Sequence, residues 1–132
     1  MSIKNTTVVA TILDIKRLAN SNLGNPRYAL ITDKGTFKTR ANSAIGYMVC
    51  GTWVGRTVAM CFDGRPSMRG ICVVTDEVSP FAAALIANGV LEKHAIMWAD
   101  ANELRAGSYM QGNLDIAEEA RKISAIYDGI TV

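Results

Sequence analysis

Positively charged side chains gather in one short segment of the sequence. The stretch GNPRYALITDKGTFKTR, residues 24–40, contains four Lys or Arg among its seventeen residues, together with a tyrosine. A phenol ring can stack on a nucleic-acid base while neighbouring cations neutralise phosphates. Two more arginines follow in the segment DGRPSMRG. The candidate basic surface comprises Arg27, Tyr28, Lys34, Lys38, Arg40, Arg65 and Arg69.

Most of these residues lie on a predicted β-hairpin. Its strands are RYALIT and TFKTR, and its loop is Asp33-Lys34-Gly35, in which the glycine can adopt the left-handed conformation that a three-residue loop needs. This loop sets Thr32 opposite Thr36. The register then predicts one apolar face, made of Ala29, Ile31 and Phe37. It predicts a second face made of Tyr28, Lys38 and Arg40. A solvated strand face without a ligand would show the same residue types.

Residues that could form a catalytic or metal centre are sparse. His94 is the only histidine, and no nucleophile motif or glycine-rich phosphate loop accompanies it. Cys50, Cys61 and Cys72 lack the close pair that most zinc sites present, so we expect reduced thiols in the core. We therefore expect no enzymatic activity, no cofactor and no bound metal.

The length and composition predict one globular domain. The chain has 132 residues, of which 49% are hydrophobic and 20% charged, and this composition can bury a core without disulfides or metals. No apolar run approaches the roughly 18 residues of a membrane span. The first residues, MSIKNTTVVATILDIKR, place charges where a secretory signal needs apolar residues, so we expect a protein of the cytoplasm with no membrane partner.

The charges divide the chain into two parts. Residues 1–75 contain ten Lys and Arg against three Asp, a net charge of +7, and residues 76–132 contain four against nine acidic residues, a net charge of −5. Such a division predicts a basic surface that meets something acidic. The acidic element is either an external partner or the second part of the protein itself, within one chain or between two copies.

The first part is typical of a small β-structure. A strand is predicted in TTVVATILDI, and TVAMCF and MRGICVV form a second hairpin around Asp63-Gly64. The segment ANSAIGYMVC predicts a short helix between the two hairpins, beginning at Asn42 or Ser43. The four hairpin strands with this helix between the second and third fit a strongly bent antiparallel sheet or barrel, SH3-like or OB-like.

The second part predicts helices. Ser79-Pro80 is a capped helix start and Gly89 a natural end. A second helix is predicted from the apolar stripe Leu91, Ala95, Trp98 and Ala101 or Asn102, ending near Gly107. A third begins at Asn113 and ends before Gly129. Its apolar stripe, a core or oligomer face, is Ile116, Ala120, Ile123 and Tyr127. We expect Trp98 and Tyr109 to be packing residues. The fold class expected is α+β, with a helical layer after the sheet.

Three segments of the sequence resemble a known class of small proteins. NPRY, TDKGTFKTRANSAIGY and FDGR, in this order and spacing, resemble small accessory proteins of bacteriophages that infect actinobacteria, over about residues 12–73. Most such proteins have no assigned function. The resemblance implies a phage setting in the host cytoplasm and a non-essential factor that binds a host molecule.

Three functions agree with these features. The first is a non-enzymatic binder of a host macromolecule, such as an inhibitor of a host or defence protein. The second is a nucleic-acid-binding small barrel that uses the candidate basic surface. The third is a self-assembling structural protein joined through its helices.

Overall fold

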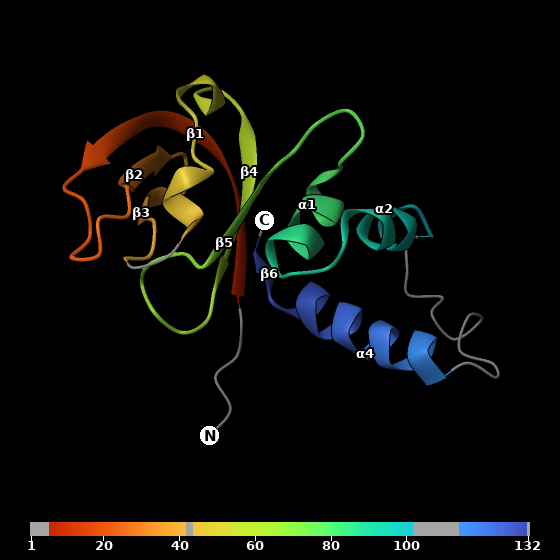
Figure 1. Ribbon diagram of the computed structural model, residues 1–132. Helices are drawn as coiled ribbons and strands as arrows, with labels where there is room; N and C mark the ends of the chain where they lie inside the picture. The colour runs from red at the N-terminus through yellow and green to blue at the C-terminus, as the bar shows by residue number, and fades with distance from the viewer. Residues whose placement is uncertain (1–5, 42–43, 102–113, 132) are drawn as a thin grey trace.

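A six-stranded sheet and a helical layer form the protein in the computed structural model, which describes residues 6–41, 44–101 and 114–131 (Figure 1). The strands are β1 (Thr6–Leu18), β2 (Arg27–Thr32), β3 (Gly35–Lys38), β4 (Thr57–Phe62), β5 (Gly70–Val73) and β6 (Ile130–Thr131). The main order, β3-β2-β1-β4-β5, is antiparallel throughout, and β6 pairs in parallel with β1. The α+β prediction is confirmed.

The sheet is not closed into a barrel, so the barrel alternative is not realised. β3 and β5 are the two ends of the strand order. Among the described residues, one isolated parallel bridge, Thr39 to Met68, joins the end of β3 to the segment before β5.

β1 changes partner in its middle. Residues 6–11 pair with β4, whereas residues 12–18 pair with β2, and the register shifts between Ile12 and Asp14. The residue inserted by this β-bulge is Leu13, whose side chain is exposed. The bulge bends the strand and explains why the apolar alternation of TTVVATILDI is uneven.

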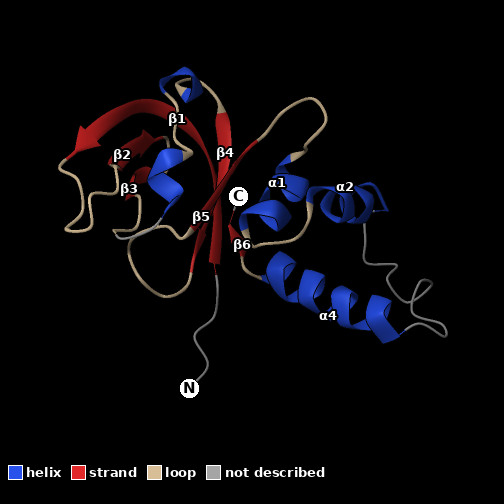
Figure 2. Cartoon of the chain, viewed as in Figure 1, coloured by secondary structure: helices blue, strands red, loops and turns tan. Residues whose placement is uncertain are grey.

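The two faces of the sheet cover two separate cores. In β4, Val58, Met60 and Phe62 belong to one core, while Ala59 and Cys61 belong to the other. Alternate residues of a strand point to opposite faces, so a strand covered on both faces is apolar throughout. The first core contains side chains of β1, β2, β4 and β5. The second contains side chains of β1, β4 and the helices, which lie on one side of the sheet in Figure 2.

The helix α1 (Pro80–Ala87) packs on the second face of the sheet. The Ser79 side chain accepts a hydrogen bond from the Ala82 amide, and Gly89 has φ of 94°, so both predicted helix boundaries are confirmed. Alanines make up most of its buried side chains and allow a close approach to β5. A Cβ on Gly70 would lie 2.1 Å from the Ala87 carbonyl oxygen.

Two further helices contact α1. These are α2 (Glu92–Ala101) and α4 (Leu114–Asp128). The expected second helix is present, but its predicted end near Gly107 lies outside the described residues, as do Asn113 and Tyr109. After α4 the chain returns to the sheet, where the Thr7 amide donates to the Gly129 carbonyl and β6 pairs with β1. No described helix is long and apolar enough to span a membrane.

The segment between β3 and β4 forms two short turns of 3-10 helix in place of the single helix expected. They are η1 (Ala44–Tyr47) and η2 (Gly51–Trp53). Gly46 of η1 lies against the backbone before β2, because a Cβ there would be 1.9 Å from the Pro26 carbonyl oxygen. The predicted starts, Asn42 and Ser43, lie outside the described residues.

Candidate functional site

The β2–β3 hairpin has a different register from the one predicted. Thr32 lies opposite Gly35 and Leu30 opposite Phe37, so the turn contains only Asp33 and Lys34. The prediction of a three-residue loop was therefore wrong, because the turn is one residue shorter. A one-residue slip moves every side chain of one strand to the other face relative to its partner.

The new register separates the side chains that were expected to lie together. Lys38 lies opposite Ala29, whereas Tyr28 lies beside Thr39, whose amide donates to the Tyr28 carbonyl at 2.9 Å. Tyr28 and Lys38 consequently project from opposite faces of the hairpin. The predicted face of Tyr28, Lys38 and Arg40 does not exist.

A different basic row occupies the outer face of the hairpin. In β1, Lys16 is the partner of Ala29, and in β3, Lys38 is its partner on the other side. Both lysines are exposed, while Ala29 is only 6% exposed although it belongs to neither core. Long lysine stems on the neighbouring strands can cover such a small apolar side chain. Sequence reasoning missed Lys16, although the alternation of Asp14 and Lys16 with Ile15 marks it as outward-facing.

Tyr28 is already engaged within the chain. The Arg17 guanidinium lies 5.2 Å from the centre of the Tyr28 ring, at cation–π distance. Arg17 also donates a hydrogen bond to the Asn20 side chain. Tyr28 packs against the first core and is half-buried. The tyrosine thus joins the loop after β1 to the hairpin.

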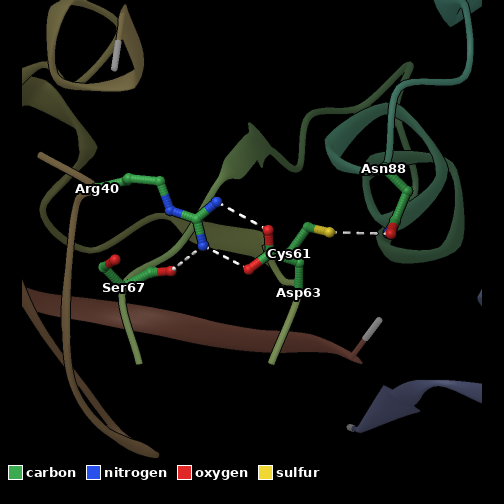
Figure 3. Close-up of polar contacts among 5 residues, drawn as sticks. All are labelled: Arg40, Cys61, Asp63, Ser67 and Asn88. Carbon is green, nitrogen blue, oxygen red and sulfur yellow. Dashed lines mark hydrogen bonds and ion pairs between the residues drawn. The ribbon is translucent and has the colours of Figure 1, made fainter. Parts of the chain in front are cut away.

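Arg40 forms the shortest ion pair among the described residues, with Asp63 (Figure 3). Its Nη1 and Nη2 donate to the two carboxylate oxygens of Asp63 at 2.8 and 2.5 Å, and Nη2 also donates to the Ser67 carbonyl at 3.2 Å. Hydrogen bonding from Arg40 lowers the pKa of Asp63 to about 2. The pKa of Arg40 is raised by the same hydrogen bond. Bidentate pairing fixes geometry as well as charge, so Arg40 holds the β4–β5 loop, residues 63–69, against the end of β3.

Backbone contacts hold the same loop at further points. The Met68 amide donates to the Lys38 carbonyl at 2.9 Å, and the Arg69 amide donates to the Cys61 carbonyl at 2.8 Å. The side chains of Arg65 and Arg69 remain exposed. The loop therefore presents two cations from a fixed backbone.

The remaining candidate residues lie around the hairpin. Lys34 in the turn donates from Nζ to the Val9 carbonyl at 2.5 Å, which covers the edge of β1 where its partner changes. Arg27 begins β2 and is half-buried, and its Nε has no hydrogen-bond partner among the described residues.

The helical layer leaves this hairpin uncovered. α1 contacts β4, β5 and β1, and Figure 2 shows the helices on one side of the sheet with β2 and β3 on the other. The acidic residues Glu92, Glu118 and Glu119 belong to α2 and α4. The basic row therefore faces away from the acidic part of its own chain.

A second group of polar residues lies between α2 and α4. His94 Nδ1 is 3.1 Å from Glu119 Oε1, and Trp98 Nε1 donates to the same oxygen at 2.6 Å. An open hollow of about 460 Å³ adjoins His94 and Lys122. No described side chain places a nucleophile with this pair, and no three His, Cys, Asp or Glu groups in residues 6–41, 44–101 and 118–130 lie close enough to bind a metal. We interpret the pair as a structural link between the helices.

The structure confirms the predicted positions of two cysteines and of two residues of the α4 stripe, and corrects the position of the third cysteine. Cys61 is buried and Cys72 half-buried, as expected, but Cys50 is exposed on the loop before η2, so its predicted core position was wrong. Ile123 is fully buried in the second core, and Tyr127 packs beside it with an edge-on contact to Phe81. These two residues therefore face the core of their own chain. Side chains of Ile116 and Ala120 lie outside the part that the structure describes.

Comparison with known proteins adds no relative to this description. No protein-family model, no curated protein and no solved structure matches the chain.

Proposed function

We propose that the protein binds nucleic acid through the uncovered face of the β1–β2–β3 sheet and the β4–β5 loop. The observation that carries this proposal is the convergence of Lys16 and Lys38, paired across Ala29, on a face that the acidic helices leave open. Arg65 and Arg69 add cations at the loop next to the same hairpin. Exposed cations contributed by separate segments suit a phosphate backbone.

The strand connectivity supports the OB-like architecture. In support of it, the strand order is β3-β2-β1-β4-β5, β1 is shared by two halves of the sheet, and a parallel bridge joins Thr39 to Met68, which agrees with a partly open five-stranded Greek-key sheet. OB-folds bind oligonucleotides on the face of strands 2 and 3 and on the adjoining loops. Because fold analogy does not establish function, the proposal rests on the charges, and the connectivity adds to it.

Arg40 has a positioning role in this proposal. Its guanidinium is committed to Asp63, so it orients the loop that carries Arg65 and Arg69. In this proposal Lys16 replaces Arg40 as a residue that contacts phosphate. Tyr28 likewise supports the hairpin from the inner side, beneath Arg17.

The test is oligonucleotide binding by fluorescence anisotropy at about 50 and 200 mM salt, the range over which phosphate contacts lose affinity. The double variant Lys16→Glu/Lys38→Glu is expected to weaken binding at least tenfold and to lower the salt slope by about two, one for each lost contact. The matched control is Lys93→Glu/Lys122→Glu, which makes the same charge change on the helices and leaves binding within twofold. Undetectable or salt-insensitive binding by the wild type contradicts the proposal, as does equal weakening by both variants.

Exposed apolar side chains favour a second candidate function, the binding of a host protein. Tyr47 and Met48 of the segment after β3 are 67% and 55% exposed. Val54 and Leu13 are also exposed, and they adjoin the two partners of the Gly55 to Ile12 hydrogen bond. Exposed apolar clusters mark protein contacts. Pull-down from host lysate with the wild type and with Tyr47→Ser/Met48→Ser tests it, and a partner retained equally by both excludes this surface. Light scattering of the same pair tests self-assembly.

A further inference from the structure

An open hollow lies at the free edge of β3, between that strand and the β4–β5 loop. Its volume is about 650 Å³, within the range of small-molecule sites. Thr36 and Phe37 of β3 form one side, Phe62 of β4 lies behind them, and Arg65 stands on the loop side. None of these positions is covered by the helical layer, which packs on the other face of the sheet.

Two aromatic rings form the apolar wall of the hollow. Phe37 and Phe62 have ring centres 5.4 Å apart and planes inclined by 50°. Phe62 is 7% exposed and belongs to the core, whereas Phe37 is half-buried and keeps part of its ring open to the hollow. A flat ring entering from solvent would therefore meet Phe37, while Phe62 keeps Phe37 in place.

The polar groups around this ring match a nucleobase and its phosphate. Hydrogen-bonded and non-bonded pairs alternate in an antiparallel ladder, and the bond from Thr39 to Tyr28 makes Thr36 a residue whose N–H and C=O point away from β2. These groups place a donor and an acceptor side by side at the hollow, near the exposed Thr36 hydroxyl. Arg65 is exposed at the rim, on a loop fixed by the bond between Arg40 and Asp63.

Thr36 also connects the hollow to the basic row. Residues 36 and 38 of a strand project to the same face, so Thr36 of the hollow is followed on that face by Lys38. Phe37 projects to the other face, towards the first core, so a strand that contacts Lys38 has to pass over the free edge of β3 at Thr36 to place its next base on Phe37.

We infer that the hollow binds one unpaired nucleobase, stacked on Phe37 with Arg65 beside an adjacent phosphate, and that the protein is consequently selective for single-stranded nucleic acid. This inference rests on the proposed function and specifies its substrate. In a duplex both faces of each base are already stacked, so a duplex offers only its phosphates to the basic row, whereas a single strand also offers a free ring.

The experiment compares a short single strand containing 2-aminopurine with the duplex of the same sequence. The wild type is expected to bind the single strand at least tenfold more tightly and to quench the 2-aminopurine fluorescence by stacking. Phe37→Leu is expected to lose between about 5- and 100-fold in single-strand affinity, the range measured for one stacked base, and to lose the quenching. Its duplex affinity and salt slope are expected to stay unchanged, because the lysines remain.

Two further variants test whether the hollow itself binds the base. Thr36→Leu narrows the hollow from an exposed edge position without altering a buried side chain, and it is expected to weaken single-strand binding in the same way. Phe81→Leu makes the aromatic substitution on α1, where the ring is 51% exposed, and is expected to change nothing. Salt-dependent binding that is equal for single strand and duplex and unaffected by Phe37→Leu and Thr36→Leu overturns the inference and leaves the proposed function standing. The absence of salt-dependent binding overturns both.

Discussion

Asn88, at the end of α1, donates a 2.7 Å hydrogen bond from Nδ2 to the hydroxyl of Thr7, which lies 81 positions away in β1. Nδ2 also donates to the Ala84 carbonyl at 2.7 Å, and the carbonyl oxygen of the side chain accepts from the Cys61 thiol at 2.9 Å (Figure 3). Asn88 thus connects α1 to two neighbouring strands inside the second core. Every member of this network is buried.

Replacing Asn88 with alanine is expected to destabilise the fold. The substitution leaves the buried Thr7 hydroxyl and Cys61 thiol without their partner, and an unsatisfied buried polar group costs about 1–3 kcal/mol. We expect a loss of about 2 kcal/mol in the free energy of unfolding, measured by urea denaturation. Asn22→Ala, on an exposed loop, is the control. A loss no larger than that of the control would show that the network does not stabilise the fold.

Any side chain at position 70 in place of Gly70 is expected to destabilise the fold. A Cβ at this position would lie 2.1 Å from the Ala87 carbonyl oxygen, so Gly70→Ala has to push α1 away from β5. Overpacking of this kind costs about 1–3 kcal/mol. Gly51→Ala serves as the matched control, because nothing lies within 4 Å of the Cβ it would add. Equal thermal unfolding of the two variants would contradict the close contact between helix and strand.

The ion pair of Arg40 and Asp63 predicts a defined acid dependence. Hydrogen bonding from Arg40 lowers the pKa of Asp63 from 3.8 to about 2, so the pair stabilises the fold fully above pH 4. This contribution is lost as the pH falls from about 4 to about 2, where the carboxylate of the folded protein takes up its proton. The difference in melting temperature between wild type and Asp63→Asn should therefore be largest above pH 4 and shrink towards pH 2. A constant difference over this range would rule out the pair as its source.

The three thiols are expected to react at different rates. Cys50 is exposed, and its hydrogen bond with the Thr52 hydroxyl, at 3.1 Å, lowers the pKa of the thiol. Burial raises the pKa of Cys61 and of Cys72. Because the thiolate is the reactive form, Ellman's reagent near neutral pH should modify one thiol quickly and two slowly.

Cys50→Ser should abolish the fast phase of that reaction. Thr52→Val, which removes the hydroxyl and keeps the shape of the side chain, should slow it. Persistence of a fast phase in Cys50→Ser would show that a core thiol is open to solvent.

Local sequence signals were sufficient for both ends of α1 and for the existence of the hairpins. Ser79, Pro80 and Gly89 set the ends of α1 by hydrogen bonding and backbone conformation within one turn, so no distant residue is needed to predict them. The two hairpins were visible because β-branched runs flank turn residues. β6 was missed, because two residues carry no periodicity and their pairing with β1 depends on where α4 ends.

The candidate site was predicted in composition but not in arrangement. The loop Asp33-Lys34-Gly35 permitted two turn lengths, and the structure has the shorter one, which moved Lys38 away from Tyr28 and placed it in a row with Lys16. Turn length in a hairpin is decided with the packing of its strands, here with Leu30 and Phe37 facing the first core.

The sequence by itself therefore determined the division into a basic β-rich part and an acidic helical part, because charge and periodicity are properties of neighbouring residues. Only the tertiary structure decided which cations are free. Arg40 is committed to Asp63 and Arg17 to Tyr28, while Lys16, Lys38 and Arg65 remain exposed. Such pairings join residues more than ten positions apart. Their partners are chosen by strand register and loop closure, which depend on burying the two cores together.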